Sequence, residues 1–215
     1  MGLPDSACPA DGVDCSVFHP QKHDPLWRRE VGCADSDIVL VYAGRFAPEK
    51  NLQQLSAAVE QLGAPFVLIA IGDGPRPPSG ARVRVLPYLK QPTELARALA
   101  SADLFVHAGD QETFGLAPLE ALACGTPVVM RARAGLTDLV DGHAAIGVEP
   151  GGAAALAEAI ASVAPNCGPL REAARRRALL FDADRAFSRL LNHYTALCLS
   201  PRLGGTGPQE ERYAA

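Results

Sequence analysis

Apolar runs of strand length alternate with helix-length segments through the middle of the chain. Strands are expected at 37–44, 66–71, 83–86, 103–107, 127–130 and 145–148, and helices at 51–62, 93–100, 115–123, 136–140 and 153–163. Mostly apolar strands that alternate with helices are typical of an α/β fold with a doubly wound, Rossmann-like parallel sheet. Such sheets bind ligands at the carboxyl ends of their strands.

Both ends of the chain differ from this alternating middle. Residues 1–25 carry four prolines and no sustained periodicity, which predicts a linker leading into the domain. A short helix is expected at 26–31. We therefore predict one domain at 26–200 and a disordered tail at 201–215.

The last part of the predicted domain is wholly helical. Helices are expected at 170–181 and 183–199, packed on the flank or edge of the sheet. The first of them is rich in arginine, at Arg171, Arg175, Arg176 and Arg177. A phosphate or lipid-headgroup patch is one interpretation, but in a chain of net charge −4 a solvated helix face is favoured.

The composition of the chain bears on which partners it can bind and on the compartment in which it is expected. A net charge of −4 gives no general attraction to nucleic acid or to an anionic membrane. No apolar run approaches the roughly 20 residues of a membrane-spanning helix, and residues 1–5 do not begin a secretory signal. The six cysteines include no Cys-x-x-Cys pair, so reduced thiols in a cytoplasmic protein without a metal site are expected.

Two loops after predicted strands carry residues suited to an anionic ligand. In the first, Gly44 is followed by Arg45 and Lys50, whose cations could bind phosphate near a helix start. Two solvated cations beside a turn glycine are the alternative. In the second, Gly72 and Asp73 could approach a ligand or simply form the turn.

A third loop runs from Glu112 to Glu120 and is the most specific. Thr113 is a candidate N-cap, which would leave the amides of Phe114, Gly115 and Leu116 free to bind phosphate or sugar oxygens. Both glutamates are acceptors suited to hydroxyl donors. Glu120 lies among apolar helix neighbours, where a carboxylate needs a partner.

Taken in chain order, these motifs resemble the C-terminal, donor-binding domain of the retaining GT-B glycosyltransferases of group 1 (family 4 like). That family includes bacterial mannosyl-, glucosyl- and N-acetylglucosaminyltransferases. The resemblance covers about 11–163 and is expected to include the helical segment that follows. It rests on 11–14 with 18–20, on 44–50, 72–75, 102–106 and 121–129, and on Glu112 and Glu120 separated by seven residues.

The resemblance implies a set of roles. The implied catalytic residues are Arg45 and Lys50, which neutralise the diphosphate of the donor, and Glu112, which binds hexose hydroxyls. Glu120 would bind the ribose, and Tyr88, between Pro87 and Leu89, would lie in the nucleobase slot. The implied donor-binding residues are Gly44, Gly72, Asp73, Tyr88, Thr113, Phe114, Gly115, Leu116 and Glu120. His107 either touches the sugar or serves the structure.

The family resemblance also implies a mechanism and partners. Fixed cations and helix-end amides would stabilise the leaving diphosphate without a metal or other cofactor, and the anomeric configuration would be retained. The expected partners are a nucleotide sugar and an N-terminal acceptor-binding domain, with no nucleic acid and with peripheral membrane contact in the full enzyme. Without that domain, we expect this chain to bind donor and to transfer poorly or not at all.

Departures and alternatives remain. The segment 131–138 carries Arg131 and Arg133 where the family usually has a glycine pair and a Pro-Glu, which would alter contacts near the donor. A free-standing, non-catalytic nucleotide-sugar-binding module is the alternative function. Epimerases and phosphorylases are disfavoured by motif order, and dinucleotide oxidoreductases by the lack of Gly-x-Gly-x-x-Gly after the first strand. Nucleobase and hexose stay open, although 107–109 resembles mannosyltransferases that use GDP-mannose.

Overall fold

A single parallel sheet organises the chain. A computed structural model describes residues 12–112, 115–132, 134–149 and 151–199. The strands have the order β3-β2-β1-β4-β5-β6 and are all parallel. They are β1 (Ile38–Ala43), β2 (Phe66–Ile71), β3 (Val83–Leu86), β4 (Leu104–His107), β5 (Val128–Arg131) and β6 (Ala145–Val148). All six predicted strands are confirmed, as is the doubly wound α/β class.

The described part of the chain contains seven α-helices. They are α1 (Pro25–Glu30), α2 (Leu52–Leu62), α3 (Pro92–Ser101), α4 (Leu116–Ala123), α5 (Gly152–Val163), α6 (Cys167–Ala178) and α7 (Ala183–Leu199). The helix predicted at 136–140 is wrong, because the chain forms only a 3-10 turn at Ala134–Leu136 there. The tail predicted at 201–215 lies outside the described residues.

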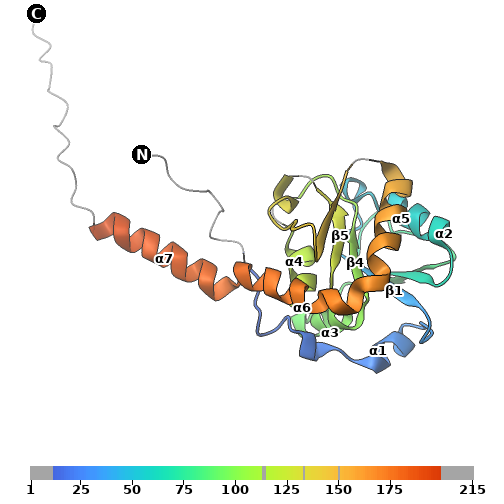
Figure 1. The fold of residues 1–215 in the computed structure, drawn as a ribbon, viewed down its shortest axis with the longest axis horizontal. Helices are drawn as coiled ribbons and strands as arrows, with labels where there is room; N and C mark the ends of the chain where they lie inside the picture. Colours follow the sequence, from blue (N-terminus) through green and yellow to red (C-terminus); the bar gives the residue numbers. More distant parts are fainter. Residues whose placement is uncertain (1–11, 113–114, 133, 150, 200–215) are drawn as a thin grey trace, which may run out of the picture.

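The sheet has a hydrophobic core on each face. Along β1, Val39 and Val41 face the core that holds the apolar side chains of α3, α4 and α6, whereas Leu40 and Tyr42 face the core of α2 and α5. Figure 1 shows these two groups of helices on opposite sides of the strands. The alternation follows from the twofold period of a strand and explains why both faces of β1 are apolar.

The pairing of β1 is uneven along the sheet. It is in register with β2 over six residue pairs, from Ile38 with Phe66 to Ala43 with Ile71. With β4 it shares two pairs, which end at Val41 and Phe105. Here the strand order reverses, because the chain leaves β1 toward α2 on one face and β4 toward α4 on the other. This is the topological switch point at which such sheets bind ligands.

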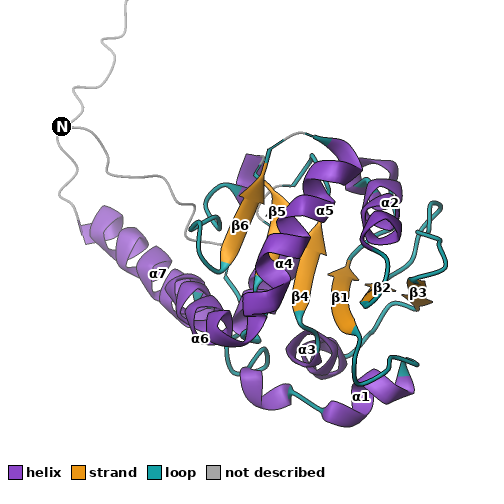
Figure 2. Cartoon of the chain, turned by 45° about the vertical axis from the view of Figure 1, so that its right-hand side comes forward, coloured by secondary structure: helices purple, strands orange, loops and turns teal. Residues whose placement is uncertain are grey.

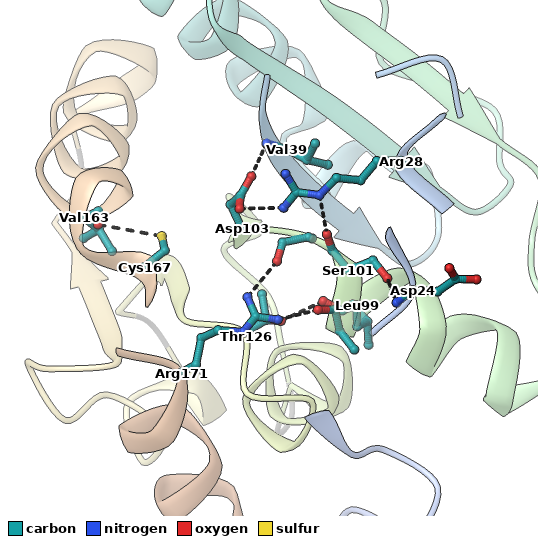
Figure 3. A network of polar contacts seen from close by, with 12 residues as sticks. Asp24, Arg28, Val39, Leu99, Ser101, Asp103, Thr126, Val163, Cys167 and Arg171 are labelled. Carbon is teal, nitrogen blue, oxygen red and sulfur yellow. Dashed lines mark hydrogen bonds and ion pairs between the residues drawn. The ribbon is translucent and has the colours of Figure 1, made fainter. Parts of the chain in front are cut away.

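A polar network holds the amino ends of β1 and β4 together (Figure 3). The carboxylate of Asp103 accepts the amide of Val39 at 2.7 Å and Nη2 of Arg28 at 2.6 Å. Nε of Arg28 donates to the carbonyl of Ser101 at 2.8 Å, and Arg171 donates to main-chain carbonyls at the end of α3. This end of the sheet is therefore filled by structural polar contacts.

The arginines of α6 correct a prediction. Nη1 of Arg175 donates to the carbonyls of Phe18 at 2.7 Å and Ala123 at 2.6 Å, and its Nη2 donates to that of Cys15 at 3.0 Å. Arg171 and Arg177 likewise bind main-chain carbonyls, and Arg176 alone of the four is exposed, paired with Glu172. The predicted solvated face is wrong because three of the four arginines bind main-chain carbonyls at turns and helix ends, where backbone acceptors lack a partner within the element.

The start of the described chain packs beside the junction between α6 and α7. Within the segment predicted as a linker, Val13 and Phe18 are buried, and Val13 exchanges main-chain hydrogen bonds with Phe181 and Ala183. α6 packs against α4, but α7 extends away from the sheet, so its predicted place on the flank is wrong (Figures 1 and 2). The five described cysteines form no disulfide, and four of them are buried.

Candidate functional site

Two neighbouring cavities lie at the carboxyl ends of β1 and β4. The first has a volume of about 430 Å³ and the second of about 240 Å³. They share the lining residues Ala43, Gly44, Leu116 and Ala117. The two volumes therefore form one extended site between the loop after β1 and the start of α4.

The structure brings most of the predicted residues to this site. Arg45, Lys50, Glu112 and Gly115 line the first cavity, Tyr88 and Glu120 line the second, and Gly44 and Leu116 line both. Thr113 and Phe114 lie outside the described residues.

Lys50, Glu112 and His107 form a compact charged group in the first cavity. Lys50 Nζ lies 2.5 Å from Oε1 of Glu112, and Nε2 of His107 lies 2.8 Å from the same oxygen. The side chains of Lys50 and Glu112 are 12% and 18% exposed, so their charges are weakly screened by water. Both of these contacts are made by Oε1, and the second oxygen of Glu112 has no hydrogen-bond partner among the described residues.

The environment of Glu112 keeps it ionised. Burial alone would raise the pKa of this carboxyl, but the hydrogen bonds from His107 and Lys50 outweigh burial and lower the pKa to about 2. At neutral pH Glu112 is therefore an acceptor only, suited to hydroxyl groups.

Glu120 has the opposite environment. It lies one helical turn into α4 on the wall of the second cavity, and its carboxylate has no hydrogen-bond or ionic partner among the described residues. Burial raises its pKa to about 7. The side chain is half-buried, and a ligand carrying hydroxyl donors would give this carboxyl the hydrogen bonds that the described residues do not supply.

Arg45 is much more exposed than Lys50, the other cation that lines the first cavity. Its side chain is 76% exposed and pairs at 3.1 Å with Glu49, four residues further along the chain. Exposed pairs of this kind contribute less than about 1 kcal/mol, so Arg45 can exchange Glu49 for another anion at little cost.

Gly72 and Asp73 line neither cavity. A Cβ atom on Gly72, whose φ is +154°, would lie 2.0 Å from the carbonyl oxygen of Gly44, so a side chain here would force the two loops apart. The carbonyl of Asp73 accepts the amide of Phe46 at 2.8 Å. The structure thus gives this pair a role in packing the loops, and a direct contact with donor stays a prediction.

The start of α4 corrects the predicted N-cap. The helix begins at Leu116, and its N-cap is Gly115, with φ of +82° and ψ of +59°, instead of Thr113. The amides of Leu116 and Ala117 therefore belong to the first turn and have no acceptor within the helix. Both residues line the first cavity, and the start of a helix favours an anion.

Sequence reasoning missed Tyr42 and misplaced Arg131. Tyr42 lines the first cavity, donates its hydroxyl to the carbonyl of Arg45 at 3.0 Å and stacks on His107 with 6.0 Å between ring centroids. A hydroxyl-bearing residue near the end of an aliphatic strand was the available signal. Arg131 binds Asp110 at 3.0 Å and lines neither cavity, and Arg133 lies outside the described residues.

The described residues contain no group of three or more metal-ligating side chains that could hold an ion. Nor does any described helix have the length and hydropathy needed to cross a bilayer.

A family model for glycosyl transferases of group 1 matches residues 37–166, the stretch that holds every lining residue of both cavities. The chain belongs to the group 1 glycosyltransferases. This glycosyltransferase chain is 33% identical over 207 residues to the GDP-mannose-dependent α-(1-6)-phosphatidylinositol dimannoside mannosyltransferase of Mycobacterium tuberculosis, with 91% of this chain and 53% of the relative covered. It is also 33% identical over 207 residues to the D-inositol 3-phosphate glycosyltransferase of Geodermatophilus obscurus, covering 86% and 46% of the two chains.

Solved structures have the same fold. Sucrose-phosphate synthase of Thermosynechococcus elongatus has a TM-score of 0.74 at 26% identity, covering 89% of this glycosyltransferase chain and 52% of the synthase. Anabaena HepE in complex with UDP and glucose has a TM-score of 0.74 at 21% identity, covering 86% and 55%. The glycosyltransferase chain spans about half the length of the relatives that it matches, and its sheet is one Rossmann-like half of a GT-B fold.

Proposed function

We propose that this chain binds the nucleoside-diphosphate sugar from which a complete group 1 glycosyltransferase transfers a hexose. The observation that carries the proposal is the placement of Lys50 and Glu112 in one cavity and of Glu120 in the adjoining one. The cation of Lys50, the ionised carboxylate of Glu112 and the carboxyl of Glu120 then lie along one site. Their charges and acceptor oxygens match the diphosphate and the hydroxyl groups of a nucleotide sugar.

The diphosphate would lie between the loop after β1 and the start of α4. Lys50 and Arg45 supply positive charge, and the amides of Leu116 and Ala117 add donors. When the glycosidic bond to the diphosphate breaks, negative charge grows on the leaving oxygen. Preorganised cations and amides stabilise that charge, and we propose that they do so without a metal.

The sugar and the nucleoside would occupy opposite ends of the site. The free oxygen of Glu112 would accept hexose hydroxyls, with His107 beside it. The ribose hydroxyls would bind Glu120, and the base would stack near Tyr88 and Leu89. Tyr88 is 67% exposed, as a side chain that covers a ligand would be.

Relatives suggest the donor class and the rest of the enzyme. One relative is named for GDP-mannose and one solved structure contains UDP and glucose, so GDP-mannose and UDP-sugars are the first candidates. Since the chain spans about half of its relatives, we propose that an N-terminal domain supplies the acceptor site, that transfer retains the anomeric configuration, and that this chain alone transfers poorly or not at all. A cytoplasmic site of action with peripheral membrane contact is part of the same proposal.

Calorimetric titration tests the donor site. The chain would be titrated with UDP, GDP and ADP, each alone and as a sugar conjugate. We expect the nucleotides of one of these three bases to bind. Lys50→Ala should weaken that binding by on the order of 1.5–3 kcal/mol, the range of hydrogen bonds to charged groups. Lys22→Ala, which changes a lysine outside both cavities, is the matched control. Absence of binding by all three bases, or equal loss in both variants, would contradict the proposal.

A further inference from the structure

Asn51 has an unusual backbone for its residue type. It is the only non-glycine residue with a positive φ in the described part of the chain, at φ 52° and ψ 36°. Left-handed backbone is unfavourable for residues with a Cβ atom, although asparagine tolerates it better than most. Asn51 is the N-cap of α2, but its side chain makes no capping hydrogen bond to that helix.

The side chain reaches instead to the loop after β4. Its Nδ2 donates to the carbonyl of Ala108 at 3.1 Å and to Oδ2 of Asp110 at 2.7 Å. Asp110 also accepts Nη1 of Arg131 at 3.0 Å, and Nη2 of Arg131 donates to the side chain of Gln54. Gln54 lies in the first turn of α2, so these four side chains close a polar ring that begins and ends at that helix.

The polar ring is buried at Arg131 and reaches solvent at Asp110, whose side chain is 37% exposed. Arg131 is 6% exposed, and its Nε is buried without a described partner, so its two Nη atoms anchor it. Charge-assisted hydrogen bonds in such surroundings are stronger than neutral ones. The ring therefore fixes Asp110 firmly relative to the start of α2.

The ring stands next to the charged pair of the site. Lys50 directly precedes Asn51, and Glu112 follows Asp110 by two residues. Lys50 and Glu112 lie on two different loops. Among described residues, and apart from the Lys50–Glu112 contact and the bonds of Asn51, one hydrogen bond joins these loops, from the amide of Asp110 to the carbonyl of Glu49 at 3.2 Å. The side-chain amide of Asn51 supplies two further bonds across the same gap.

We propose that Asn51 is a positioning residue that fixes Lys50 relative to Glu112. The inference rests on the proposed function, in which Lys50 binds the diphosphate and Glu112 binds the sugar. The diphosphate and the sugar of a nucleotide sugar are covalently linked, so the distance between them is limited. The distance between Lys50 and Glu112 therefore decides how well the diphosphate and the sugar can be bound at the same time. Asn51 touches neither group and acts through the two loops.

A titration without ligand tests the positioning directly. The carboxyl of Glu112 would be followed by carbon NMR in the whole chain and in Asn51→Gly, which keeps the left-handed backbone accessible and removes the bridging amide. We expect the pKa of Glu112 to rise by about one unit, because Lys50 would be held less closely. Gln53→Gly, an exposed position in the same turn of α2, is the matched control and should leave that pKa unchanged.

A second readout uses the nucleoside diphosphate that binds the unaltered chain. Asn51→Gly should weaken its binding about threefold to tenfold, and should add no further loss in a Lys50→Ala background, as residues acting through one another do. Asn51→Asp, which sets a second carboxylate against Asp110, should show a larger loss.

An unchanged pKa of Glu112 in both Asn51 variants would overturn the inference. It would also be overturned if Asn51→Gly weakened nucleoside diphosphate binding as much in the Lys50→Ala background as in the unaltered chain. If the unaltered chain binds no nucleoside diphosphate, the proposed function fails, and the NMR titration alone then decides the positioning role.

Discussion

Glu120 should make the stability of the chain depend on pH in a predictable direction. Burial raises the pKa of this carboxyl from 4.5 to about 7. A shift of that size corresponds to on the order of 3 kcal/mol at about 1.4 kcal/mol per unit. Since the raised pKa means that the folded chain binds its proton more tightly than the unfolded chain, stability should be lost as pH rises from about 4.5 to 7 and should then level off.

Glu120→Gln isolates this effect because the amide keeps the shape of the acid and cannot ionise. Urea unfolding at pH 5, 6, 7 and 8 would give the free energy of unfolding of both chains. We expect a small difference at pH 5, and at pH 8 a gain approaching 3 kcal/mol for the variant. Glu158→Gln, at an exposed carboxylate on α5, is the matched control. A difference for Glu120→Gln that does not grow with pH would refute the reasoning.

The same carboxyl links stability to ligand binding. Ribose hydroxyls donate hydrogen bonds, and a carboxylate accepts them better than a neutral acid does. Nucleotide affinity of the unaltered chain should therefore rise between pH 6 and 8, and the rise should vanish in Glu120→Gln. Glu120 would then be a residue that lowers stability in order to bind ligand.

Three further substitutions test separate parts of the structure. Glu112→Gln should weaken binding of the sugar conjugate and spare the bare diphosphate, and calorimetry showing equal losses would contradict that division. Gly115→Ala should lower the free energy of unfolding by about 2 kcal/mol or more, since a Cβ atom there would lie 2.2 Å from a leucine side chain. Gly142→Ala, the control, is also at positive φ but has open space around it, and it should lower the free energy of unfolding by about 1 kcal/mol. Equal urea midpoints for the two variants would refute the clash at Gly115. Arg175→Met should cost about 2–4 kcal/mol by leaving buried carbonyls unpaired, against less than about 1 for the exposed Arg176→Met, both measured by urea unfolding.

The fold was predictable because its signals are local. The central strands β1 and β2 are short apolar runs, and the loops that follow β1 and β4 carry charge at the edge where a doubly wound sheet binds ligands. Lys50 and Glu112 could therefore be placed together from the sequence, although their sharing of one oxygen with His107 could not.

What the sequence concealed depends on partners far apart in the chain. Nothing in the spacing of Arg175 indicates that its acceptors are the main-chain carbonyls of Cys15, Phe18 and Ala123. The cap of α4 was mistaken because a hydroxyl residue is the commoner N-cap, whereas here a left-handed glycine packed against the turn at 134–136 begins the helix. Both errors arise where tertiary contacts override local preference.

The parting of β1 from β4 after two residue pairs has a mechanical consequence. Lys50 leads into α2 on one face of the sheet, and Leu116 begins α4 on the other. A ligand that touches both residues would add a link between two layers whose loops are already joined by the Lys50–Glu112 and Asn51–Asp110 contacts. Ligand binding would therefore stabilise the packing of both helix layers on the sheet. A substitution that destabilises either layer would also lower the affinity for the ligand.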